Sequence, residues 1–315
     1  MIRVENLVKN FGAVEAVRGI NFTVQDGEIL GFLGPNGAGK STTLRILTTY
    51  LSPTAGSVSI DDYDITRHPT EVRRLIGYLP EQNPLYGDML VYDQLSFVAA
   101  VRGIRGKAFR IALGRVMDVC GIREVIHRKL DELSKGYRQR VGLAQAIIHD
   151  PKILILDEPS SGLDPNQIVE IRELIKRLGK EKTVIMSSHI LQEVQAVADR
   201  IVILNEGEVV ADGTYAELMA GFEGRAQLTL ELKNADQAAI EALPDRFPEI
   251  EIQQGEATAA GYRVRLSYPT GKDLREQLFL HAVESGWVVL EMSRQEAKLE
   301  DVFRQLTVKG AGARA

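Results

Sequence analysis

One loop near the N-terminus constrains the fold more than any other feature of this chain. Residues 34–41, Gly-Pro-Asn-Gly-Ala-Gly-Lys-Ser, follow the pattern G-x-x-x-x-G-K-[ST]. An apolar run at 29–33 precedes them and a helical pattern at 42–51 follows, which predicts a strand, a glycine loop and a helix. In such a loop the backbone N–H groups and the helix N-terminus surround phosphate oxygens. The loop therefore predicts a site for a nucleoside phosphate, unless it is only a glycine turn in front of a lysine.

The residue types within this loop indicate how the phosphates are held. Lys40 is expected to reach the β- and γ-phosphates, and the Ser41 hydroxyl is expected to ligate Mg²⁺. The residues expected to bind the nucleotide in this segment are Gly34, Pro35, Asn36, Gly37, Ala38, Gly39, Lys40, Ser41 and Thr42.

A second polar group follows the apolar run at 153–156, which predicts a buried strand. Asp157 and Glu158 come directly after it. Uncompensated charge is costly to desolvate, so two acids at the end of a buried strand indicate a function. Asp157 is suited to hold Mg²⁺, directly or through water, and Glu158 is suited to polarise the water that attacks the γ-phosphate. The alternative is an acidic strand end that faces solvent.

The surrounding pattern is that of an α/β protein. Continuous apolar runs alternate with helical patterns over the first two thirds of the chain, which predicts a parallel sheet covered on both faces. Residues 2–5 and 20–24 alternate in polarity and predict an antiparallel sheet, and residues 201–210 predict a hairpin. The apolar runs are 29–33, 153–156 and 183–186.

Composition excludes several classes of protein. The length of 315 residues allows two domains, and the net charge of −5 excludes a strongly basic surface for nucleic acid. Cys120 is the single cysteine, which excludes an intramolecular disulfide framework and a cysteine-based metal cluster. We see no transmembrane segment and no signal peptide, so we expect a cytoplasmic protein that needs a partner for any role at a membrane.

The pattern changes near residues 221–224, where a second domain is expected to begin. The order strand, helix, strand, strand, helix, strand predicts a small α+β domain of ferredoxin-like type. We expect a first domain at 1–222, an accessory domain at 225–308 and a disordered tail at 309–315. The expected strands are 227–232, 249–253, 262–267 and 287–292, and the expected helices are 235–243, 272–284 and 299–306.

Further motifs identify a family. Residues 133–140, Leu-Ser-Lys-Gly-Tyr-Arg-Gln-Arg, resemble the signature of the ATP-binding-cassette (ABC) ATPases, usually L-S-G-G-Q followed by R-Q-R. The resemblance covers about residues 1–220 and implies a P-loop NTPase fold with a RecA-like core, an antiparallel β subdomain and a helical subdomain. The other matching residues are Phe11 for the adenine-stacking aromatic, Gln82 for the Q-loop, Asp164 for the D-loop (161–164) and His189 for the switch histidine.

This resemblance implies roles for these residues and implies ATP and Mg²⁺ as the cofactors. The implied catalytic residues are Glu158, His189 and Gln82, and the implied metal ligands are Ser41, Gln82 and Asp157. The further implied nucleotide contacts are Phe11, Ser134, Gly136 and Asp164. Each residue also has a plainer interpretation, with Phe11 in the core, Gln82 in a solvated loop and His189 at a strand end.

In this family two cassettes pack head to tail, with ATP between the phosphate loop of one and the signature of the other. The resemblance therefore implies a homodimer or heterodimer of cassettes. Ser134 and the Gly136 N–H group are expected to complete the γ-phosphate site from across the interface. Lys135 and Tyr137 differ from the glycine and glutamine that are usual in the signature.

The resemblance is closest to the ATPases of ABC-2-type exporters. Residues 134–146 and 164–167 look like the gliding-motility-associated ATP-binding subunits. Residues 299–303 resemble the ending of the accessory domain in multidrug and antibiotic exporter subunits; the alternative is an amphipathic helix docked on the sheet. The implied function is ATP-driven dimerisation that powers a separately encoded permease at the inner face of the cell membrane.

The helical segment between Gln82 and Leu133 is where the family receives its permease. Leu85 and Tyr86 are the expected contacts, whereas the basic residues of this segment are read as a solvated face. Soluble ABC ATPases of the repair or translation type are the alternative class. Repair types insert coiled coils or zinc-binding cysteines and translation types carry two cassettes, and this chain has neither feature. A regulatory module without turnover would lack Glu158 or His189, and both are present.

Overall fold

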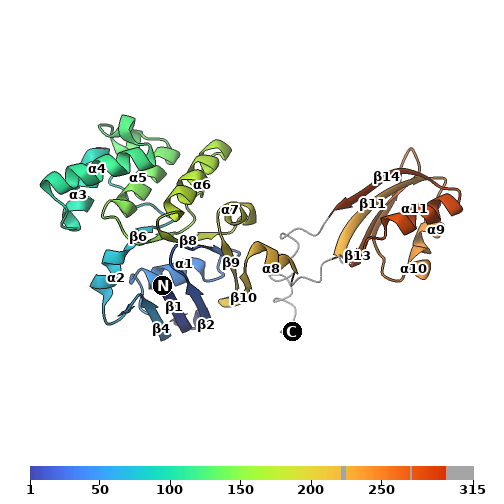
Figure 1. Cartoon of the computed structure of the whole chain (residues 1–315), viewed down its shortest axis with the longest axis horizontal. Coiled ribbons are helices and arrows are strands. Elements are labelled where there is room, and N and C mark those ends of the chain that lie inside the picture. The colour runs from blue at the N-terminus through green and yellow to red at the C-terminus, as the bar shows by residue number, and fades with distance from the viewer. Residues whose placement is uncertain (221–224, 270–271, 296–315) are drawn as a thin grey trace. The chain divides into compact units, whose positions relative to one another are not determined.

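The structure is a computed structural model that describes residues 1–220, 225–269 and 272–295 (Figure 1). The described residues form two compact units that divide between Tyr215 and Ala216. The helix expected at 299–306 and the tail expected at 309–315 lie outside the described residues.

A six-stranded sheet carries the phosphate loop of the first unit. Its strands are β3 (Ile29–Leu33), β6 (Ile76–Leu79), β7 (Ile153–Leu156), β8 (Thr183–Ser188), β9 (Arg200–Asn205) and β10 (Glu208–Gly213). The order is β10-β9-β3-β8-β7-β6, and every neighbouring pair is parallel except β9 with β10. The predicted parallel sheet and the predicted hairpin are both confirmed.

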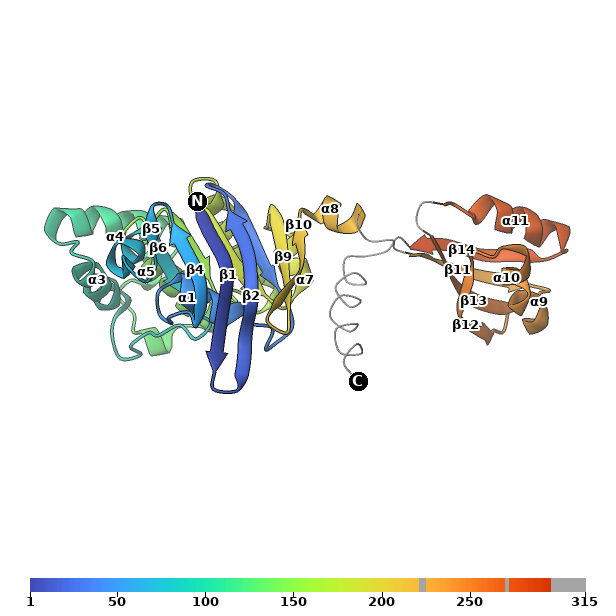
Figure 2. The same ribbon diagram turned by 90° about the horizontal axis from the view of Figure 1, so that it is seen from below.

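A four-stranded antiparallel sheet forms from the N-terminal segment. Its strands are β1 (Ile2–Phe11), β2 (Val14–Val24), β4 (Ala55–Ile60) and β5 (Tyr63–Asp64). The order is β2-β1-β4-β5, and β1 and β2 run side by side (Figure 2). Ile2 pairs with Val24 and Val4 with Phe22, so the two alternating segments of the sequence are neighbours, as predicted.

The helices of the first unit are mostly short. They are α1 (Lys40–Leu47), α2 (Pro69–Leu75), α3 (Val91–Val101), α4 (Gly106–Cys120), α5 (Lys135–Ile147), α6 (Pro165–Gly179), α7 (Leu191–Gln195) and, at the division between the units, α8 (Tyr215–Ala220). Two 3-10 turns lie at Arg123–Val125 and Leu130–Glu132. The helix predicted at 42–51 ends earlier, because Thr49 has a φ of 61°, in the left-handed region that a right-handed helix does not enter. Among the described residues, none of the helices combines the length and the apolar character that a membrane span requires.

The two faces of the central sheet bury separate cores. Along β7, Ile153 and Ile155 pack into one cluster while Leu154 and Leu156 pack into another, because successive side chains of a strand point to opposite faces. Helices α3, α4 and α5 lie on one side of this sheet, and strands β1, β2 and β4 lie on the other (Figure 1). Burial of both faces explains why these strands read as uninterrupted apolar runs.

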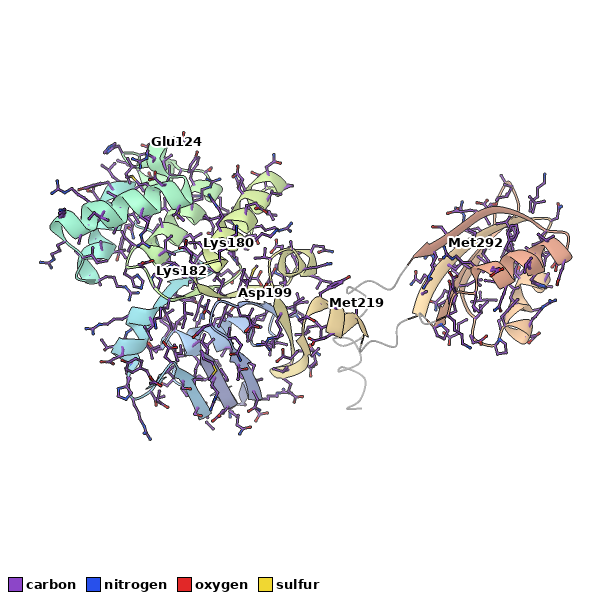
Figure 3. All side chains as sticks on the ribbon, viewed as in Figure 1. Glu124, Lys180, Lys182, Asp199, Met219 and Met292 are labelled. Atoms are coloured by element: carbon purple, nitrogen blue, oxygen red, sulfur yellow. The ribbon has the colours of Figure 1, made fainter. Side chains whose placement is uncertain are left out.

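The strand before the phosphate loop is fixed at its beginning and in its middle. The Ile29 N–H group donates a hydrogen bond of 2.8 Å to the Asp199 carboxylate, which is labelled in Figure 3. In the middle of β3, a Cβ atom on Gly31 would come within 2.1 Å of the Val194 side chain of α7. Glycine at this position therefore lets α7 pack directly against the strand that leads into the loop.

The described residues from 225 onward form a four-stranded antiparallel sheet with three helices. Its elements are β11 (Arg225–Lys233), α9 (Gln237–Glu241), α10 (Leu243–Arg246), β12 (Glu251–Ala257), β13 (Tyr262–Pro269), α11 (Arg275–Glu284) and β14 (Val288–Gln295). The strand order is β12-β13-β11-β14. One face buries Leu228 and Leu230 against Leu278 of α11, and Met292 of β14, labelled in Figure 3, packs against this core. The helix predicted at 235–243 is shorter, at Gln237–Glu241, and a second short helix begins at Leu243, with Pro244 in its first turn, where a missing N–H group costs nothing.

Candidate functional site

A cavity of about 620 Å³ opens at the phosphate loop. Strands β3, β7 and β8 end beside it, since the carboxyl ends of parallel strands meet at one edge of a sheet. The cavity is lined by Phe11, Ala16, Asn36, Gly37, Ala38, Gly39, Lys40, Ser41, Thr42, Glu81, Glu158, Ser161 and His189.

Two glycines of the loop have no room for a side chain. A Cβ atom on Gly34 would lie 2.4 Å from the Leu204 carbonyl oxygen, and one on Gly39 would lie 2.6 Å from the Ala16 carbonyl oxygen. Gly39 also has a φ of 100° and is the N-cap residue of α1, where it offers no side chain to the first N–H groups of the helix. Those N–H groups are therefore available to an anionic ligand.

The Lys40 ammonium group lies beneath the loop. This residue is only 5% exposed, and its Nζ donates hydrogen bonds to the carbonyl oxygens of Gly34 (2.8 Å) and Pro35 (3.2 Å). Glu158 Oε1 lies 3.5 Å from the same Nζ. The loop thus brings a buried positive charge to the wall of the cavity.

The Asp157 carboxylate meets two hydroxyl groups. Ser41 Oγ and Ser187 Oγ donate to Asp157 Oδ1 at 2.9 and 2.7 Å. Asp157 is completely buried, and its other oxygen, Oδ2, has no hydrogen-bond partner among the described residues. Because buried carboxylate oxygens are normally paired, an orphaned one beside a serine hydroxyl fits a hard divalent cation such as Mg²⁺.

Glu158 and His189 form a hydrogen-bonded pair at the cavity. His189 Nδ1 lies 2.9 Å from Glu158 Oε2, and Glu158 is 7% exposed. The backbone of Glu158 has a φ of 48°, which is uncommon for a residue with a side chain, and its N–H group donates to Ser187 Oγ at 3.0 Å. Such strain persists only where surrounding contacts hold it, and it concentrates at functional sites.

The structure brings together most, but not all, of the predicted site residues. Phe11 is 48% exposed and lines the cavity, so its alternative interpretation as a core residue is wrong. Gln82 is exposed and lines a second cavity instead. The other predicted residues that do not line the phosphate-loop cavity are Gly34, Pro35, Asp157, Ser134, Gly136 and Asp164. The roles of all the predicted site residues in nucleotide binding, metal binding and catalysis stay predictions.

The signature and the D-loop pack against each other within the chain. The Ser134 and Asp164 side chains cap α5 and α6 by accepting hydrogen bonds from the backbone N–H groups of Tyr137 and Gln167. A Cβ atom on Gly136 would lie 2.7 Å from the Gln167 side chain. A Cβ atom on Gly162 would lie 2.0 Å from Lys135 Nζ, so this lysine lies over the D-loop of its own chain.

A second cavity, of about 530 Å³, lies between the central sheet and the helices around α3. Burial, followed by the charge of Asp157, raises the pKa of the Tyr78 phenol in its wall to about 12. Tyr86 and Phe97 are exposed and pack edge to face, with ring centroids 6.1 Å apart. The lining residues are Arg45, Tyr50, Tyr78, Pro80, Gln82, Pro84, Val98, Arg102, Gln145 and Ala146.

Sequence reasoning missed several residues of the site. Ser187 contacts both Asp157 and the Glu158 backbone, and it pairs with Phe32 in the parallel register of β3 and β8. The clue in the sequence was the pair of predicted strands at 153–156 and 183–186. Residues at the ends of adjacent parallel strands meet at one edge of the sheet, so Ser187 could be expected near Asp157. Glu81 was also missed: it lines the phosphate-loop cavity, whereas its neighbour Gln82 lines the second cavity.

Comparisons with known proteins agree on one family. A family model described as "ABC transporter" matches residues 17–161. The bacitracin transport ATP-binding protein BcrA of Bacillus licheniformis is 33% identical over 97% of each chain, and the linearmycin resistance ATP-binding protein LnrL of Bacillus subtilis (strain 168) is 29% identical over 98% of each. Among solved structures, the dimeric MJ0796, a bacterial ABC transporter cassette, matches 68% of this chain and 98% of its own with a TM-score of 0.62 and 27% identity. A post-hydrolysis state of MJ0796 bound to ADP and Pi matches equally well.

Proposed function

This chain belongs to the ABC transporter family as an ATP-binding subunit and ABC-type ATPase, and we propose that it powers an exporter of the ABC-2 type. The observation that carries the ATP-hydrolysis part of this proposal is the Glu158–His189 pair, which lies beside the buried Lys40 and beside Asp157, one of whose oxygens has no partner among the described residues. Two relatives that match almost the whole chain are named for bacitracin transport and linearmycin resistance. The finer gliding-motility branch rests only on the sequence stretches at 134–146 and 164–167.

We propose that the phosphate loop binds the triphosphate of ATP. Its N–H groups and Lys40 hold the β- and γ-phosphates, for which the ammonium exchanges carbonyl partners for phosphate oxygens. Phe11, exposed at the rim of the cavity, stacks on the adenine ring. Ser41 and Asp157 would hold Mg²⁺, which when bound neutralises charge that develops on the phosphates.

In the hydrolytic step Glu158 acts as the general base. Its carboxylate accepts a proton from the water that attacks the γ-phosphorus, while the leaving ADP departs from the opposite side. His189, which directly follows β8, holds one carboxylate oxygen at 2.9 Å and lines the cavity in which the phosphates would lie. Gln82 lines the second cavity, so its loop has to move before this side chain can reach the phosphate site. Such a movement could couple the phosphate site to a bound partner.

Dimerisation completes the site under this proposal. Ser134, Gly136 and Asp164 are outside the phosphate-loop cavity of their own chain, which is expected if they serve the cavity of a second cassette. The dimeric MJ0796 supports such an assembly for a chain of this fold. Mixing this purified chain with a related cassette would distinguish a homodimer from a heterodimer.

The permease is proposed to dock at the second cavity, which would bring the chain to the inner face of the cell membrane. Gln82 lines this cavity, and the exposed Tyr86–Phe97 pair is close to its lining residues in the sequence. Exposed aromatic groups are typical of interfaces. Arg45 and Arg102 add positive charge to its wall.

Residues 225–308 are proposed to be a separate accessory domain of ferredoxin-like fold, following a cassette at 1–222. The strand order β12-β13-β11-β14 and the order of helices and strands along the chain support this assignment. The division of contacts between Tyr215 and Ala216 supports a boundary close to the expected one.

Co-purification tests the transport role. The tagged chain, isolated with its native membranes in mild detergent, is expected to bring down an integral membrane protein with several spans. Tyr86→Asp is expected to reduce this yield several-fold by placing a charge in the proposed docking surface, while Tyr215→Asp, also at an exposed tyrosine, leaves it unchanged. Recovery of ribosomes or DNA repair factors instead would favour the soluble, non-transport class.

A further inference from the structure

A buried acid on α7 belongs to none of the roles above. Glu193 is 3% exposed, and its Oε2 accepts two hydrogen bonds, from Ser160 Oγ at 2.6 Å and from Ser188 Oγ at 2.8 Å. Within the described ranges no lysine, arginine or histidine forms an ion pair with it. Burying a carboxylate without a cation is costly, so its presence here indicates a role other than stability.

The two hydroxyl groups belong to the two segments that carry the hydrolytic pair. Ser188 immediately precedes His189, and Ser160 follows Glu158 by two residues. Ser188 Oγ also accepts a hydrogen bond of 3.0 Å from the Ile190 N–H group, which fixes the backbone on the far side of His189. One carboxylate oxygen therefore joins the loop after β7 to the last residue of β8.

The helix that carries Glu193 is itself held firmly. Leu191 and Val194 of α7 are buried, and Val194 packs against the backbone of β3 at Gly31. β3 leads directly into the phosphate loop. The carboxylate thus connects the two hydrolytic segments to the part of the sheet that positions the triphosphate.

We propose that Glu193 is a positioning residue for ATP hydrolysis, which holds Ser160 and Ser188 and thereby keeps Glu158 and His189 in their mutual geometry. It lines no part of the phosphate-loop cavity, so it acts through the two serines. The phosphate loop makes no hydrogen bond to it among the described contacts, so ATP binding does not depend on it. Its loss should therefore lower kcat and leave KM unchanged.

Three substitutions of Glu193, by Gln, Asp and Ala, distinguish the effect of side-chain length from the effect of charge. Glu193→Gln keeps the length of the side chain and an oxygen that accepts both hydroxyl groups, whereas Glu193→Asp keeps the charge but is one methylene too short. We expect the Gln variant to retain at least about a third of the wild-type kcat. The kcat of the Asp and Ala variants should fall about tenfold or more, because small displacements of catalytic groups lower rates by such factors. KM for MgATP should stay within about twofold, because uniform binding is untouched. If Asp retains activity and Gln loses it, the charge itself acts and the proposal is wrong.

Val116→Ala is the destabilising control, because it removes buried atoms from α4, a helix that carries none of the proposed site residues. It is expected to lower Tm by at least as much as Glu193→Ala and to leave kcat within about twofold. Equal losses of kcat in the two variants would reduce Glu193 to a structural role and overturn the proposal.

The proposal rests on the proposed roles of Glu158 and His189, and the background of His189→Ala tests it separately from them. If His189→Ala itself leaves kcat unchanged, the hydrolytic mechanism fails. If His189→Ala lowers kcat, adding Glu193→Ala should cost less than about twofold more, because residues that act as a unit are not additive. A further tenfold loss in that background would show that Glu193 acts elsewhere.

Discussion

Glu158→Gln is expected to lower steady-state ATP hydrolysis at least a hundredfold while ATP still binds with near wild-type affinity. A general base contributes roughly 10² to 10⁴ in rate, and glutamine keeps the size of the side chain without its basicity. The glutamine amide also keeps an oxygen that can accept a hydrogen bond from Lys40 and an NH₂ group that can donate one to His189. Phosphate release measures the rate, and titration with a fluorescent ATP analogue measures the affinity.

The same variant should accumulate as an ATP-bound dimer, because hydrolysis is the step that releases the partners. Multi-angle light scattering with and without MgATP is the direct measurement. Glu173→Gln, an exposed acid on α6, is the matched control and should turn over like the wild type. Wild-type-like hydrolysis by Glu158→Gln would remove Glu158 from the role of base.

Lys40→Ala is expected to abolish ATP binding in the usual assay range. Hydrogen bonds to charged groups are worth about 1.5–3 kcal/mol each, or roughly ten- to a hundredfold in affinity per bond. Removal of the ammonium also leaves Glu158, which lies 3.5 Å from it, as an uncompensated negative charge facing the phosphates. Both effects weaken binding of the triphosphate.

Calorimetric titration with MgATP measures the loss, and a thermal melt checks that the variant is folded. Lys107→Ala, at an exposed position on α4, should bind ATP like the wild type. A folded Lys40→Ala protein with unchanged affinity would contradict the assignment of the phosphate loop.

The fold of the nucleotide-binding unit is largely predictable from local pattern. The runs at 29–33, 153–156 and 183–186 lack alternation because both faces of their sheet are buried, and each ends at the cavity edge. Local pattern fails where one residue changes the backbone. The turn at Thr49 shortens α1, and the helix expected at 235–243 ends at Glu241, just before a second helix with Pro244 in its first turn; neither effect is visible in hydrophobic periodicity.

The site is predictable where residues are consecutive and unpredictable where it depends on side-chain direction. Lys40 and Ser41 lie in one loop and Asp157 and Glu158 follow one strand, so their placement follows from the fold. Gln82 and Glu81 are neighbours that face different cavities, which the sequence does not reveal. Glu193 reads as a polar residue on a short helix, and only the approach of Ser160 and Ser188 from two other segments shows its burial.

The central claim is that ATP is hydrolysed at a site shared head to tail by two cassettes. Ser134 is exposed at the N-terminus of α5, away from the phosphate-loop cavity of its own chain. An arginine there would fill the γ-phosphate position of the opposite cassette without touching its own ATP. Ser285→Arg, at an exposed serine that follows α11, is the matched control.

The decisive measurement is the molar mass in saturating MgATP of Ser134→Arg in the Glu158→Gln background, by light scattering. We expect a monomer that still binds ATP, whereas Ser285→Arg in the same background should remain a dimer. A normal ATP-bound dimer of the Ser134→Arg protein would contradict the shared site.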